Sequence, residues 1–149
     1  MAGNATPQFT KNGTIGAPLV ITAANTSSQG GGTIATDIFK MLTADATNGT
    51  FVEFVRWMPT ATTPTTTTAT VGRLFLSSVT AGATTTTNTH LIAEVALPAI
   101  AADSATLAVN WIDVALNIRL PAGWTLLATN HAAPAANTAW KAIPFGGDY

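Results

Sequence analysis

Cysteine and charge are what this 149-residue chain has least of. It contains no cysteine, which excludes a disulfide framework, thiolate-bound metal centres and a thiol nucleophile. Charged residues make up only 9% of the chain, whereas an ordinary globular domain has about 25%. The formal net charge is −1 and the basic residues are scattered along the chain. We therefore expect no nucleic-acid partner, because phosphate neutralisation requires clustered lysine and arginine.

Long apolar runs are also missing. The most apolar region, residues 91–120, is interrupted by acidic residues, a proline and an asparagine. No uncharged stretch therefore reaches the ~20 residues that a membrane-spanning helix needs. The first ten residues lack the positive segment and apolar run of a secretory signal. We expect no membrane partner.

Threonine and alanine together supply more than a third of the chain, and short apolar runs alternate with turns rich in Gly, Pro and Asn. Threonine suits strands because its branched Cβ packs well on a pleated surface. No apolar stripe of helical period extends over three turns. The pattern predicts eight strands, at residues 18–24, 33–42, 50–58, 69–77, 90–97, 107–120, 124–130 and 138–145.

The spacing of these strands is typical of an all-β fold, and we predict an antiparallel eight-stranded β-sandwich of the jelly-roll type. In residues 112–120, five apolar residues alternate with polar ones, which predicts a half-buried strand with Trp111 on its outward face. We expect the strand at 50–58 to stop at Pro59, and the loop at 25–32 to be flexible by composition. A single domain then covers residues 17–149.

Residues 1–16 form a polar segment too sparse in apolar side chains to build a core. We predict an extended N-terminal arm here. Small uncharged side chains suit a surface that neighbours cover, because burying a charge without a partner costs several kcal/mol. The arm then orders onto an adjacent subunit, with Phe9 and Ile15 as its anchors. Outward-facing Trp111 marks an interface or ligand contact, with self-association favoured over sugar binding.

Reactive side chains give no catalytic or metal site, and we predict neither a metal nor another cofactor. His90 and His131 each lack a second ligand within four residues. A Ser/His/Asp set could be drawn from Ser77 or Ser78, His90 and Asp103, but any chain of this length supplies such a trio and no nucleophile elbow is present.

Two carboxylates in predicted strands, Glu53 and Glu94, could face each other as an acid–base pair for glycoside hydrolysis. They could equally pair across a sheet with an arginine, from among Arg56, Arg73 and Arg119. We favour the structural pairing and predict no catalytic residue.

Several segments resemble a family of small tailed-phage and prophage virion proteins. The likeness covers roughly residues 35–149 and rests on NGTFVEFVR (48–56), VGRLFL (71–76), LIAEVALP (91–98), ALNIRLPAGWTL (115–126) and the closing GGDY (146–149). These motifs are structural: strand, turn and strand, with Pro and Gly at fixed places. The threonine runs at 60–68 and 84–87 and the N-terminal arm depart from the family pattern.

The resemblance implies a non-enzymatic virion structural protein, foremost a capsid decoration (cement) protein. Such a protein is made in the host cytoplasm and sits on the capsid exterior, as a homotrimer bound to the major capsid protein. The alternative is a tail or head-fibre component that binds host-surface glycans through exposed aromatic residues. A third hypothesis, a small β-sandwich enzyme, lacks a credible set of acid and base groups.

Overall fold

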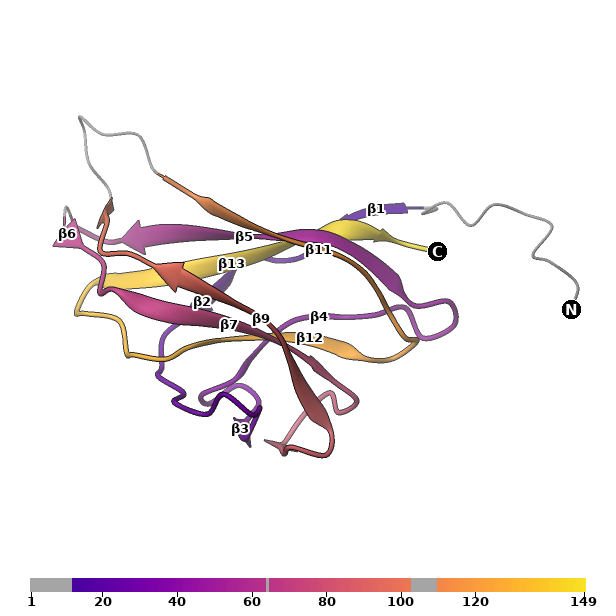
Figure 1. Ribbon diagram of the computed structural model, residues 1–149. Helices are drawn as coiled ribbons and strands as arrows, with labels where there is room; N and C mark the ends of the chain where they lie inside the picture. Colours follow the sequence, from indigo (N-terminus) through magenta and orange to yellow (C-terminus); the bar gives the residue numbers. More distant parts are fainter. Residues whose placement is uncertain (1–11, 64, 103–109) are drawn as a thin grey trace, which may run out of the picture.

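Two antiparallel β-sheets form the body of the molecule (Figure 1). The computed structural model describes residues 12–63, 65–102 and 110–149, and no helix occurs within them. Sheet A has the order β1-β13-β5-β11, and β2 also pairs with β13. Its strands are β1 (Asn12–Ile15), β2 (Leu19–Ile21), β5 (Thr50–Ala61), β11 (Ile112–Leu120) and β13 (Thr138–Asp148). The predicted all-β class is confirmed.

Sheet B has the order β4-β12-β7-β9 and lies against sheet A, so the whole is a sandwich. Its strands are β4 (Phe39–Thr43), β7 (Thr70–Ser77), β9 (Thr89–Leu97) and β12 (Thr125–Asn130). Two short strand pairs complete the described structure. They join β3 (Gly32–Thr33) to β8 (Ala83–Thr84) and β6 (Thr65–Thr66) to β10 (Ala101–Ala102).

The main core lies between the two sheets and takes alternate residues from their strands. The alternation predicted for residues 112–120 is confirmed, because the apolar residues of β11 pack on this core while the polar ones between them are exposed. Trp57 and Trp140 are fully buried. The largest fully buried side chains of this core are Ile21, Val52, Val55, Trp57, Leu74, Leu97, Leu120, Leu126 and Trp140.

Strand β5 runs through Pro59 to Ala61, so the prediction that it stops at Pro59 is wrong. Strand β11 pairs with β5 only between Thr50 and Trp57, which leaves β13 as the described neighbour of β5 beyond that point. Within the described residues, Pro59 therefore lies where β5 is an edge of the sheet, and proline is tolerated at an edge because it has no N–H to donate.

Part of the outer face of sheet B is covered by the chain itself. Ile34 and Ile38 pack against Phe75 and Leu127 in a second, smaller core. The start of this covering segment, residues 25–32, was expected to be flexible. Hydrogen bonds tie it together, from the Asn25 side chain to the Gly31 carbonyl (3.0 Å) among others. Figure 1 shows β3 and its loops on the far side of sheet B from sheet A.

The last part of the expected N-terminal arm belongs to sheet A. Residues 12–15 form β1, which pairs with the end of β13. Ile15 stands opposite Phe145 in this register. Phe9, the other expected anchor, lies outside the described residues, as do residues 107–109 at the start of a predicted strand. None of the described residues forms a helix that could cross a membrane.

Candidate functional site

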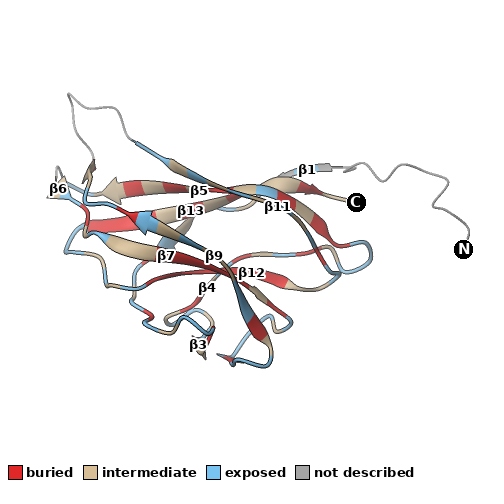
Figure 2. Ribbon diagram, viewed as in Figure 1, coloured by how far each residue is buried: buried red, intermediate tan, exposed pale blue. Residues whose placement is uncertain are grey.

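The outer face of sheet A carries a partly exposed apolar cluster. We define this outer face by the side chains that alternate with core residues on four strands: Val20, Phe54, Arg56, Met58, Trp111, Asp113, Ala115, Lys141, Ile143 and Phe145. Among the described residues, no segment lies over it, in contrast to the partly covered outer face of sheet B (Figures 1 and 2). Half-buried residues alternate with buried ones along most of β5 and β13, and exposed residues alternate with half-buried ones that pack on the core along β11 (Figure 2).

Arg56 stands at the centre of this cluster. Asp113 on β11 and Ile143 on β13 are its cross-strand partners. Its guanidinium donates to both carboxylate oxygens of Asp113, at 2.7 Å from Nε and 2.8 Å from Nη2. The same guanidinium lies 4.7 Å from the ring centroid of Trp111. It is thus a cation held between a carboxylate and an aromatic face, which are the two contacts that arginine makes best.

Two phenylalanines extend the aromatic surface along the next row of the sheet. Phe54 and Phe145 are cross-strand partners whose ring centroids lie 4.5 Å apart, with an angle of 13° between the ring planes. Both rings lie 5.6 Å from the Arg56 guanidinium. Such contacts fix the side-chain conformations before any partner arrives, which lowers the entropy lost on binding.

The ion pair shifts the proton affinity of both its members. The hydrogen bond from Arg56 lowers the pKa of Asp113, and the bond to Asp113 raises the pKa of Arg56. Both groups are therefore charged across the neutral range and satisfy each other. The centre of the outer face has no net charge to offer to a partner.

Trp111 is the most exposed large apolar side chain of the described structure. It is 54% exposed, so its predicted outward orientation is confirmed. Trp57 and Trp140 are in the core instead, and Trp124 is half-buried. A large ring left in water beside other apolar groups is typical of a binding surface.

The candidate catalytic residues from the sequence do not come together in the structure. Glu53 lies in sheet A and Glu94 in sheet B, where Glu94 accepts a hydrogen bond from Arg73 at 2.6 Å. Ser77 bonds to the hydroxyl of Thr89 (2.8 Å). Asp103 lies outside the described residues. The described residues thus contain no assembled catalytic set, and no group of three or more side chains among them could hold a metal ion.

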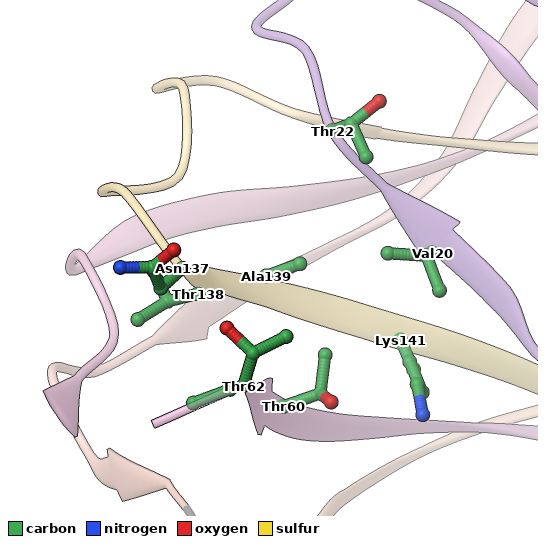
Figure 3. Close-up of a pocket in the computed structure, with 9 residues that line it drawn as sticks. Val20, Thr22, Thr60, Thr62, Asn137, Thr138, Ala139 and Lys141 are labelled. Carbon is green, nitrogen blue, oxygen red and sulfur yellow. The ribbon is translucent and has the colours of Figure 1, made fainter. Parts of the chain in front are cut away.

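A shallow groove of about 330 Å³ continues the outer face at one end of sheet A (Figure 3). Ala139 forms its floor, Val20 and Thr22 line one side, and Thr60 and Thr62 line the other. Lys141 lies at one end of the groove. The walls are mostly methyl groups, so the groove suits an apolar segment with a negative group near the lysine.

Sequence reasoning found Trp111 but missed its neighbours Arg56, Phe54 and Phe145. Their strands are far apart in sequence, and only the sheet order brings them together. The one available signal was alternation in residues 50–58, which a bulge near Glu53 interrupts.

These features make the outer face of sheet A the candidate binding surface. It has aromatic side chains, a closed ion pair and an adjacent groove, and it offers no arrangement of reactive groups. Compared with known proteins, the chain matches no protein-family model, no curated protein and no solved structure.

Proposed function

We propose that this protein is a non-enzymatic virion structural protein of a tailed phage. In this proposal it is a capsid decoration protein that binds the outside of the major capsid protein shell as a homotrimer. The observation that carries the proposal is the outer face of sheet A. It is apolar, it is uncovered by any described residue, and the charges at its centre are already paired.

The strand order supports an eight-stranded jelly roll. If β1 and β2 count as two halves of one strand, eight principal strands follow along the chain. The first pairs with the eighth, the second with the seventh, the third with the sixth and the fourth with the fifth. This nesting is that of one long hairpin rolled into two sheets, and jelly rolls are common in viral capsid domains.

The chemistry of the outer face suits a protein partner. Burying an unpaired charge costs several kcal/mol, whereas Arg56 brings its own counter-ion, Asp113, into the interface. Trp111 and the two stacked phenylalanines supply the type of side chain that dominates binding energy at interfaces. A protein that binds only the assembled shell stabilises that shell by mass action.

Electron microscopy of intact particles tests the proposal. Phage particles that carry the protein are labelled with antibodies against it, and the label is located on the particle. We expect label over the whole head surface. Label confined to the tail, or particles without label, would contradict the decoration role.

The alternative is a tail or head-fibre component that binds host-surface glycans. One observation favours it: Trp111 is exposed, and the polar groups of Arg56 and Asp113 lie beside it. A sugar ring could stack on the indole and bond to these groups. A glycan array separates the two functions, because only the alternative predicts binding that is lost in Trp111→Ala.

A further inference from the structure

Two charged side chains of the described structure differ from the others because they have no bonding partner. Among the described residues, Glu53 and Lys141 are the only Asp, Glu, Lys or Arg side chains that have neither a hydrogen-bond nor an ion-pair partner. They have opposite charge, and both belong to sheet A. In a chain with so few charges, two unpaired ones in the same sheet need an explanation.

Glu53 stands out from the sheet at a bulge. The consecutive residues Phe145 and Gly146 of β13 pair with Phe54 and Val52, which leaves Glu53 without an opposite residue. Val52 before it is buried in the core, whereas Glu53 is exposed. A bulge redirects a side chain in this way and places it clear of its neighbours. The carboxylate therefore projects from the outer face.

Lys141 lies towards the opposite end of the same face. It stands between Val20 on β2 and Met58 on β5 in the cross-strand register. Its side chain is half-buried and lines the groove over Ala139 (Figure 3). Lys141 thus lies at one end of a groove whose walls are mostly methyl groups, and no described anion pairs with its ammonium group.

These two charges cannot meet within one chain. Met58, the partner of Lys141, is five residues along β5 from Glu53, which at about 3.3 Å per residue amounts to roughly 17 Å. Because Glu53 and Lys141 lie towards opposite ends of the same face, they can form an ion pair only between neighbouring copies. A groove of about 330 Å³ has room for a carboxylate side chain.

We propose that Glu53 of one copy enters the groove of a second copy and pairs there with Lys141. This inference rests on the proposed function and names the contact that would build its homotrimer. When this contact repeats around a threefold axis it is heterologous, because each copy then gives Glu53 to one neighbour and its groove to the other, and three copies close a ring. The centre of the outer face, with Arg56 and Trp111, stays available to the shell.

Charge reversal tests this pairing in solution, with no capsid present. The oligomer is measured by light scattering and sedimentation for the wild type, Glu53→Lys, Lys141→Glu and the double variant. Like charges facing each other across an interface repel, so each single reversal should raise the dissociation constant at least about tenfold. The double variant restores opposite charges and should recover most of the loss.

Lys40→Glu is the matched control, because Lys40 is exposed on β4 of sheet B and makes the same change in net charge. Ala139→Leu is a second test that changes no charge: it fills the groove floor and should also weaken the oligomer. Thermal melts of each variant verify that it is folded.

The proposal is overturned if the wild type is a monomer, or if Lys40→Glu acts as strongly as Lys141→Glu. It is equally overturned if the folded double variant associates no better than the single reversals. A monomer that still decorates heads would remove this contact and leave the decoration role standing. A stable oligomer with no affinity for heads would contradict the decoration role and leave this contact standing.

Discussion

Arg56 and Asp113 face each other across β5 and β11, joined by two hydrogen bonds of 2.7 and 2.8 Å. Their pairing turns the middle of an apolar sheet face into a neutral surface. The arginine also lies against Trp111, so one ion pair fixes the position of the most exposed aromatic ring. Loss of either partner should therefore affect binding more than folding.

The pair makes stability depend on pH in a defined direction. Because Arg56 lowers the pKa of Asp113, the folded protein holds this proton less tightly than the unfolded chain does. The contribution is present above the unfolded pKa of about 3.9 and is lost as pH falls through the lower folded pKa. We expect the difference in Tm between the wild type and Asp113→Asn to shrink below about pH 4.

Thermal melts at a series of pH values measure this difference. The pKa of Asp45 is also lowered, by backbone N–H groups of Asn48 and Thr47, so it titrates in the same range. Both proteins retain Asp45, and its contribution cancels in the comparison. A difference in Tm that stays constant down to strongly acidic pH would contradict the assignment.

Trp111→Ala should separate binding from stability. The side chain is 54% exposed, so its removal should change the free energy of unfolding by no more than about 0.5 kcal/mol. On shells, the loss of an exposed aromatic anchor should cost about 2 kcal/mol of binding, or roughly thirtyfold in Kd. Cosedimentation with shells measures this. Leu91→Ala, at an exposed leucine of sheet B, is the control and should bind as the wild type does.

The glycines at two turns offer a matched pair. Gly49 and Gly82 both have φ of +77°, but a Cβ at Gly49 would lie 2.3 Å from the Leu120 carbonyl oxygen, whereas Gly82 faces open space. Gly82→Ala should destabilise by about 1 kcal/mol from backbone strain alone. Gly49→Ala adds a backbone clash and should cost clearly more. Equal losses in urea titrations would show that the close approach does not matter.

Ile38→Ala tests the cover of sheet B. Ile38 is fully buried against Phe75 and Leu127, and truncation of such a side chain costs about 2–5 kcal/mol. Amide exchange should accelerate most in residues 25–38, because this segment then loses its anchor. A loss below about 1 kcal/mol would mean that the cover contributes little to folding.

Deletion of residues 1–11 tests the expected contact arm while leaving β1 intact. The deleted part includes Phe9, and Ile15 stays in register with Phe145. We expect an unchanged Tm and lower occupancy on heads, measured by quantitative gel analysis of purified particles. Unchanged occupancy would show that the arm makes no contact with the shell.

Local pattern predicted much of this fold and little of its surface. The alternation in β11 predicted on which face of the sheet each side chain lies. It also predicted the exposure of Trp111, because side chains along a strand point to alternate faces. It could not predict the extension of β5 through Pro59, which depends on where the pairing with β11 begins, at Ile112. It also missed β1, since four residues with little apolar character become a strand only beside β13.

The outer face was beyond local pattern for a similar reason. Arg56 meets Asp113 and Phe145 only after three strands, distant in sequence, become neighbours. Glu53 was considered as an acid or as a partner for arginine. Its position at a bulge, apart from the arginines of both sheets, depends on the register between β5 and β13. The family resemblance bears on none of these contacts.

Strand β13 follows all the other strands of sheet A in sequence yet lies inside that sheet, between β5 on one side and β1 and β2 on the other. During synthesis, sheet A therefore cannot close until residues 138–148 have emerged from the ribosome. Until then the emerging polypeptide exposes unpaired strands, and such long-range pairing is intrinsically slow. Newly made chains should therefore depend on chaperones in the cell more than the folded protein does.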